Sequence, residues 1–197
     1  MEKLICNAPW GKAKSSSFAR VVALALAGAV GTAFADTAIN LANSLSTVEG
    51  VYTVEGTVVT LVKTNETYNL SGSGAWSVVL GADAFLNLNA VTLTPASGAA
   101  IDLNGHRADV AFTGESKLTG ANSYAGLQVN EGSTLTLSGY GNTQKITLQG
   151  NGGAASLGSA ANRNAGIITI NGGTVVANAP NYIRMVNLST GFTKDGN

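Results

Sequence analysis

The chain has 197 residues, of which 45% are apolar and only 11% are charged, and its formal net charge is zero. From Asp36 onward, seven Lys and Arg residues face ten Asp and Glu residues, a net charge of −3 that excludes the basic surface needed for nucleic-acid binding. Cys6 is the one cysteine, which excludes a disulfide framework and a cysteine-ligated zinc site.

Residues 1–35 have the pattern of a secretory signal peptide. Four basic residues come first, an apolar run follows over 21–34, and Ala33-Phe34-Ala35 is a small-x-small cleavage motif before Asp36. The run is too short and too rich in Ala and Gly for a transmembrane helix, and an uncleaved N-terminal anchor is the alternative. We therefore expect a secreted, extracellular or cell-surface bacterial protein that meets the membrane only through the signal peptide before cleavage.

Residues 36–60 are expected to form an N-terminal cap and the first strands. The polar segment 36–49 fits neither strand nor helix spacing and is suited to covering the open end of a stack of strands. From Val51 onward, apolar and polar residues alternate in short segments with no helical period, as in β-strands.

Three later segments resemble one another, namely 100–112, 126–137 and 166–177. Each has a short alternating strand, an Asn and a Gly, and a second short strand. The first strands place Val78, Ile101 and Leu127 at intervals of 23 and 26 residues, and a 40-residue step to Ile167 contains a Gly- and Ala-rich segment. Periods in the twenties with short strands are typical of a β-solenoid, so we predict an all-β, single-domain repeat fold.

The alignment of the repeats also predicts which residues stack. Leu103, Val129 and Ile170 would lie above one another in the core. Asn104, Asn130 and Asn171 would fall at the same corner, where stacked amides can bond along the axis and Asn tolerates the turn conformation.

The repeats at 126–137, 150–154 and 166–175 resemble those of bacterial extracellular carbohydrate-binding domain-containing proteins, and they are similar in style to the passenger repeats of autotransporter adhesins. The resemblance covers roughly residues 101–177. It implies a single-stranded right-handed parallel β-helix (β-solenoid) over 61–197, with an inserted loop at 150–165, and a shape related to that of pectate lyases. It also implies non-catalytic binding of a polysaccharide or surface glycan.

Calcium is the cofactor that this resemblance would bring. Its acidic clusters have no clear counterpart, because Asp83, Asp102 and Asp109 are spread over different turns. We therefore predict no metal site and no cofactor.

Groups that could catalyse a reaction are sparse. His106 is the one histidine, and it lies in a turn with Arg107 and near Asp102 and Asp109; a polysaccharide lyase would need such a cluster, but a solvated corner ion pair is expected instead. Glu115 and Glu131 fall in turns of successive repeats, where two carboxyl groups would suit glycoside hydrolysis, but solvated turn acids are expected. No catalytic residue is predicted.

The predicted ligand-binding residues are aromatic and amide side chains in or near loops. Aromatic rings stack on the apolar faces of sugars, and amides bond sugar hydroxyls. This favours Tyr124, Tyr140, Trp76, Asn122 and Gln128, with tyrosines packed on the protein's own side as the alternative.

Recognition is expected where the repeats differ, in the loops at 115–125, 138–144 and 150–165. The alternative functions are a structural or adhesive passenger segment of an autotransporter-like surface protein and, less favoured, a polysaccharide lyase. The sequence gives no oligomeric state.

Overall fold

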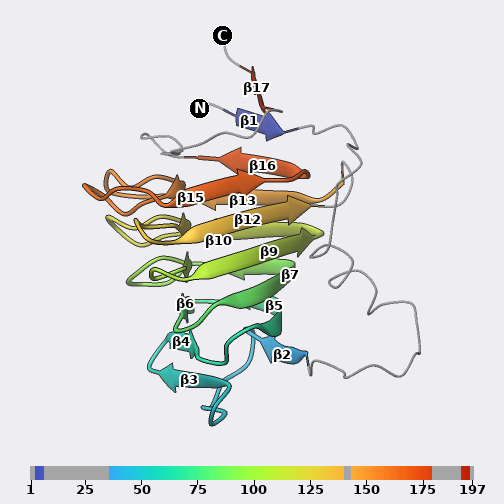
Figure 1. Ribbon diagram of the computed structural model, residues 1–197, viewed down its shortest axis with the longest axis vertical. Helices are drawn as coiled ribbons and strands as arrows, with labels where there is room; N and C mark the ends of the chain where they lie inside the picture. The colour runs from blue at the N-terminus through green and yellow to red at the C-terminus, as the bar shows by residue number, and fades with distance from the viewer. Residues whose placement is uncertain (1–2, 7–35, 140–142, 179–191, 196–197) are drawn as a thin grey trace.

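The computed structural model describes residues 3–6, 36–139, 143–178 and 192–195, and these residues form β-strands, turns and loops (Figure 1). The nine-stranded sheet contains β2 (Thr37–Asn40), β5 (Glu66–Gly74), β7 (Ala84–Leu93), β9 (Arg107–Thr113), β10 (Glu115–Thr119), β12 (Thr134–Gly139), β13 (Lys145–Gln149), β15 (Ile167–Ile170) and β16 (Thr174–Ala177). The six-stranded sheet contains β3 (Tyr52–Glu55), β4 (Val58–Leu61), β6 (Ser77–Leu80), β8 (Ile101–Asp102), β11 (Leu127–Gln128) and β14 (Leu157–Gly158).

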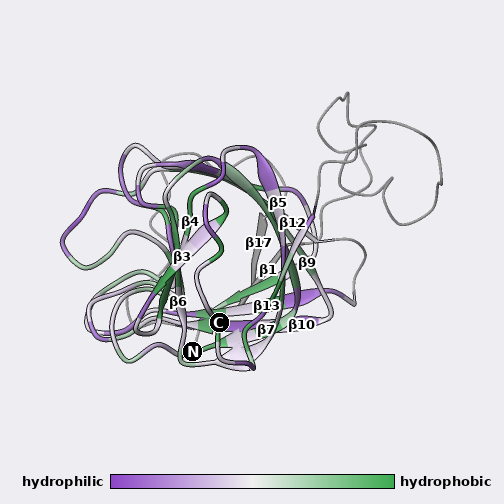
Figure 2. Cartoon of the chain, turned by 90° about the horizontal axis from the view of Figure 1, so that it is seen from below, coloured by the Kyte–Doolittle hydropathy of each residue, from purple (hydrophilic) through white to green (hydrophobic). Residues whose placement is uncertain are grey.

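The strands lie one above another along the long axis of the molecule (Figure 1). The six-stranded sheet has the order β14-β11-β8-β6-β4-β3, and the main path of the nine-stranded sheet is β15-β12-β9-β7-β10-β13-β16. Seen along the axis, the strands surround the core (Figure 2). The loops beside β11 and β14 project from the side of the six-stranded sheet (Figure 1).

The all-β prediction is confirmed, but the predicted single-stranded right-handed parallel β-helix is wrong. β7 pairs with β5, β9 and β10 within one sheet, so the strand order of that sheet doubles back along the chain. The second sheet is mixed, because β3 and β4 pair antiparallel. Apart from the two-stranded sheet of β1 (Lys3–Cys6) and β17 (Phe192–Asp195), the described strands therefore form two sheets. Alternation in a sequence shows which side of a strand is buried, but it does not show which strands pair.

Irregularities in the two long strands, β5 and β7, explain this strand order. The pairing of β5 with β7 shifts register between Ser71 and Ser73, and Ala90 in β7 has a φ of 49°. A bulge bends a strand and increases its local twist. The first part of β7 therefore pairs with β9 and its last residues pair with β10.

The register of the last repeat also differs from the prediction. Leu127 pairs with Leu157, because the expected inserted loop at 150–165 contains β14, and Ile167 pairs instead with Thr134. Ile170 therefore aligns with Leu137 in the other sheet.

The predicted asparagine ladder is absent at the described corner. Asn104 Nδ2 donates to the carbonyl of Leu80 at 3.2 Å, and Asn130 Oδ1 accepts from the N–H of Ala160 at 3.3 Å. A side-chain bond between stacked asparagines occurs instead between Asn69 in β5 and Asn87 in β7, at 2.7 Å.

Columns of apolar side chains fill the space between the sheets. One column runs through successive paired positions, each no more than 4% exposed: Tyr68, Leu86, Val110, Leu137 and Ile170. Burial of one such aliphatic side chain contributes about 1.5–3 kcal/mol. Because charged residues are few, this burial is the main source of stability.

The two ends of the chain are described only in part. β1 (Lys3–Cys6) pairs antiparallel with β17 (Phe192–Asp195). The rest of the expected signal peptide, residues 1–2 and 7–35, lies outside the described residues. In the part of the chain that the structure describes, no helix is long and apolar enough to cross a membrane.

Leu137→Ala should lower the free energy of unfolding by roughly 2–5 kcal/mol, because it removes a fully buried side chain from the middle of a column. The matched control is Thr136→Ala on the outer face of the same strand, which should cost less than about 1 kcal/mol. Urea unfolding of both variants measures the difference, and equal losses would contradict the assigned core.

Candidate functional site

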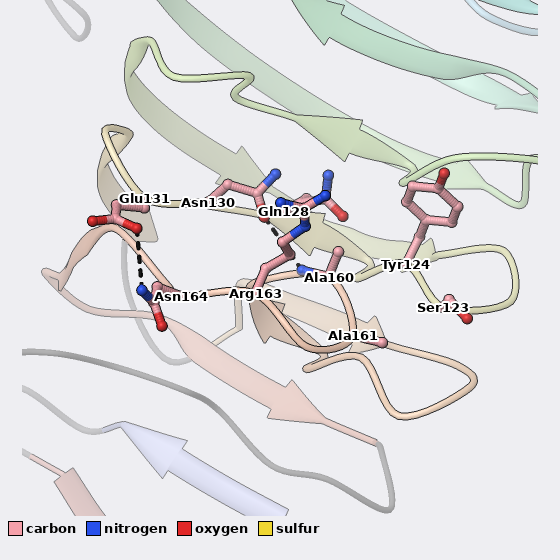
Figure 3. A pocket seen from close by; sticks show the side chains of 9 residues that line it. All are labelled: Ser123, Tyr124, Gln128, Asn130, Glu131, Ala160, Ala161, Arg163 and Asn164. Carbon is pink, nitrogen blue, oxygen red and sulfur yellow. Dashed lines mark hydrogen bonds between the residues drawn. The ribbon is translucent and has the colours of Figure 1, made fainter.

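A pocket of about 490 Å³ opens beside β11 (Figure 3). Two chain segments line it. The first is 123–131, which contains β11, and the second is 160–164, which follows β14. The lining residues are Ser123, Tyr124, Gln128, Asn130, Glu131, Ala160, Ala161, Arg163 and Asn164.

Backbone hydrogen bonds hold the two segments together on both sides of the pocket. The N–H of Ala161 donates to the carbonyl of Ser123 at 3.1 Å, and the N–H of Glu131 donates to the carbonyl of Asn164 at 3.0 Å. Ser123 and Asn162 have φ values of 70° and 58°, in the left-handed region that tight turns use. The pocket is therefore built by turns that are fixed to each other across neighbouring strands.

Gln128 lines the pocket from β11, on the side of the strand that faces away from the core. Leu127 points into the core, so strand alternation should expose Gln128, yet it is only 2% exposed. Its paired neighbours are Asp102 in β8 and Gly158 in β14. Gly158 has no side chain and a φ of 133°, so no side chain continues this column beyond Gln128.

The Gln128 amide makes one hydrogen bond and leaves one acceptor without a partner. Its Nε2 donates to Asp102 Oδ2 at 2.5 Å. Its Oε1 is buried and has no hydrogen-bond partner among the described residues. A buried polar atom in this state costs about 1–3 kcal/mol. Such atoms are rare in native structures, and this one lies in the lining of a pocket.

Burial raises the pKa of the Asp102 carboxyl above its usual value, while hydrogen bonds from the N–H of Asn104 and from the Gln128 amide lower it. Burial is the largest of these effects, because it disfavours the charged form. Asp102 therefore takes up a proton more readily than an exposed aspartate does.

Two charged side chains lie at the rim of the pocket. Glu131 Oε2 accepts a hydrogen bond from Asn164 Nδ2 at 3.1 Å. Arg163 is exposed, and its guanidinium makes no ion pair or hydrogen bond with the described residues. Its backbone is fixed, since its carbonyl accepts from Ser159 Oγ at 2.7 Å. Figure 3 shows Tyr124 at the opposite side of the pocket from Glu131.

The structure brings together two of the five predicted ligand-binding residues. Tyr124, 39% exposed, and Gln128 both line the pocket. Asn122 is exposed in the same loop but is not part of the lining. Trp76 is partly buried and packs against the core beside β6, away from the lining residues. Tyr140 lies outside the described residues.

Sequence reasoning missed five polar lining residues as individual ligand contacts: Ser123, Asn130, Glu131, Arg163 and Asn164. Ser123 falls in the expected recognition loop at 115–125, and Arg163 and Asn164 fall in the one at 150–165. Asn130 and Glu131 belong to a turn for which the sequence predicts an architectural or solvated role. The signal that could have found them is Leu157, because a strand there brings 160–164 against Ser123, Asn130 and Glu131.

The residues considered for catalysis do not form one cluster. Arg107 pairs with Asp109 at 3.1 Å, which confirms the expected corner ion pair. His106 Nδ1 lies 3.6 Å from Asp83 Oδ1, whereas Asp102 bonds Gln128. Within the described ranges, no group of three or more His, Cys, Asp and Glu residues could hold a metal ion.

The two glutamates considered for glycoside hydrolysis have separate neighbours. Glu115 lies 3.4 Å from Lys145 in the adjacent strand. Glu131 bonds Asn164 at the pocket rim. The carboxyl pair that glycoside hydrolysis would need therefore does not form between them.

Comparisons of the chain with protein-family models, with curated proteins and with solved structures found no match.

The raised pKa of Asp102 predicts a defined dependence of stability on pH. The folded state holds the Asp102 proton to a higher pH than the unfolded state does. The stabilisation of the folded state by this group is therefore fully present below the pKa of the unfolded state, about 3.9, and it is lost as pH rises through the pKa of the folded state. Asp102→Asn removes the titration. The unfolding free energy of the native chain minus that of the variant should therefore fall across this window in urea unfolding at a series of pH values. A difference that rises or stays constant would contradict the assignment.

Proposed function

We propose that this chain is a non-catalytic glycan-binding protein, secreted or displayed at the cell surface, whose pocket beside β11 receives a sugar unit of a polysaccharide. The observation that carries the proposal is the lining of the pocket. An exposed aromatic ring, Tyr124, shares an open space of about 490 Å³ with the amides of Gln128, Asn130 and Asn164. The size is within the usual range of small-molecule sites, about 300–1,000 Å³.

The chemistry of the lining suits a sugar ring. The face of Tyr124 offers an apolar surface to ring C–H groups. Asn130 uses its Oδ1 on Ala160, and its Nδ2 makes no bond to the described residues, so two N–H donors remain for ligand hydroxyls. Sugar hydroxyls both donate and accept, so they can replace the waters on these amides with little loss.

The carboxyl groups of the pocket favour binding over hydrolysis. Glycoside hydrolysis uses two carboxyl groups on either side of the scissile bond. Among the described lining residues, Glu131 is the one carboxylate. Asp102 lies behind Gln128 and is bonded to its amide.

The sequence of residues 1–35 supports export. Basic residues, an apolar run and the Ala33-Phe34-Ala35 motif occur in the order of a signal peptide. Cleavage there would remove β1, so its pairing with β17 would belong to the uncleaved chain.

Export predicts a mature protein that begins at Asp36. When the full chain is produced in a bacterial host, intact-mass measurement of the periplasmic and medium fractions should find this form. Ala33→Arg places a large charged side chain in the cleavage motif and should leave the precursor uncleaved. Recovery of the native chain only as the Met1 form inside the cell would contradict export.

Tyr124→Ala should weaken glycan binding at least about tenfold, or about 1.4 kcal/mol, because it removes the aromatic face of the pocket. A glycan array first identifies ligands of the wild-type chain, and titration calorimetry then compares the variants.

Ile167→Ala is the matched control, since it removes an exposed apolar side chain of β15 outside the pocket and should leave affinity unchanged. Binding to no glycan on the array, or equal affinity of Tyr124→Ala and wild type, would overturn the proposed function.

A further inference from the structure

The deep end of the pocket has an acceptor that needs a donor. Gln128 Oε1 is buried without a partner among the described residues, and the facing Gly158 has no side chain that could donate to it. The opposite amide orientation would place Oε1 against the ionised Asp102 carboxylate, two acceptors in contact, so the bond from Nε2 to Asp102 keeps Oε1 turned away. A ligand hydroxyl at this point would satisfy Oε1 and remove the cost of leaving it unpaired.

The rim of the pocket has a cation that needs an anion. Lys63, Arg107 and Lys145 each lie within 3.4 Å of a carboxylate, whereas the exposed Lys117 on β10 has no such partner among the described residues but is not part of the pocket lining. Arg163 has no such partner among the described residues, although its backbone is fixed by Ser159. Its planar guanidinium offers five N–H donors in a fork that matches a carboxylate or a similar oxyanion.

The nearby carboxylates make no ion pair with this cation, and both accept hydrogen bonds from other donors. Glu131 accepts from Asn164, and Asp102 accepts from Asn104 and Gln128. The charge of Glu131 at the rim also disfavours a ligand with several adjacent anionic groups. The pocket therefore suits a ligand with a single negative group, which would pair with the Arg163 guanidinium.

Access to Gln128 Oε1 requires a side chain to move, since the atom is buried. Arg163 and Gln128 line the same pocket (Figure 3). Arg163 is exposed and its guanidinium makes no bond to the described residues, so turning it toward an anion at the rim breaks no described hydrogen bond. We expect a ligand to reach Gln128 Oε1 when Arg163 moves in this way.

We propose that the pocket selects an anionic sugar unit, with Arg163 binding a single oxyanion substituent and Gln128 Oε1 accepting a hydrogen bond from a hydroxyl of the same unit. This inference rests on the proposed glycan binding and names the class of glycan. A uronate carboxylate and a sulfate ester share the required chemistry, and the experiment distinguishes them.

The test uses an array of matched oligosaccharides, in which each of several backbones carries a neutral, a uronate and a sulfated form. The wild-type chain should bind the uronate or the sulfated forms at least about tenfold more tightly than their neutral parents. Which of the two it prefers identifies the oxyanion. The preference should shrink as salt rises from about 0.05 to 0.5 M, because the rim is exposed to solvent.

Variants assign the effect to the two residues. Arg163→Gln should remove at least about tenfold of the affinity for the anionic form and leave the neutral form unchanged. Lys117→Gln is the matched control, since Lys117 is an exposed cation on β10 outside the pocket. It should bind like the wild type. Gln128→Met keeps the side-chain length without the acceptor, and it should weaken binding of anionic and neutral forms alike.

The outcomes separate this inference from the function on which it rests. Equal binding of neutral and anionic forms, or anionic binding that survives Arg163→Gln, overturns the anionic selectivity. If that equal binding still depends on Tyr124, glycan binding itself stands. Binding of no form on any backbone overturns both.

Discussion

The parallel ladder that joins β8, β11 and β14 is the constraint on which the pocket depends. Each of these strands is only two residues long, with its first residue in the core and its second on the outer face, where β14 has a glycine. The core positions are Ile101, Leu127 and Leu157, all fully buried. Because these three leucine and isoleucine side chains fix the register, the outer positions are fixed as well, and Gln128 must lie between Asp102 and Gly158.

Much of the fold could be predicted from alternation, and the pairing of strands could not. The sequence of β12 shows which residues are buried, since Leu135 and Leu137 are separated by polar threonine. Nothing local shows that β7 pairs with three other strands, because that depends on its length and on the bend near Ala90. Periodicity is local, whereas strand order is set by contacts between distant segments.

The site was predicted only in part for the same reason. Tyr124 and Gln128 are found from residue type and position, because an aromatic and an amide beside a repeat suit a glycan. The positions of Arg163 and Asn164 could not be predicted, because the strand before them, β14, has only two residues. The residues around it are small, so the sequence there shows no alternation of apolar and polar residues. Once Leu157 is paired with Leu127, the segment 160–164 lies against Ser123, Asn130 and Glu131, and these contacts form the pocket.

Two unfavourable features of the structure, at Asp102 and Gln128, lie side by side on the outer face of β8 and β11. They distinguish the pocket from the rest of this face. The outer position before Asp102 in the same column is Val79, which needs no hydrogen bond. At the next two positions the chain instead buries a carboxyl group with a raised pKa and an amide with an unpaired oxygen. A stack selected for stability alone would continue with β-branched residues there. Local violations of good packing and hydrogen bonding are expected at functional sites, where a ligand completes what the protein leaves open. Under the proposed function, a ligand that donates a hydrogen bond to the open acceptor of Gln128 would therefore also stabilise the folded chain at the column from Asp102 to Gly158.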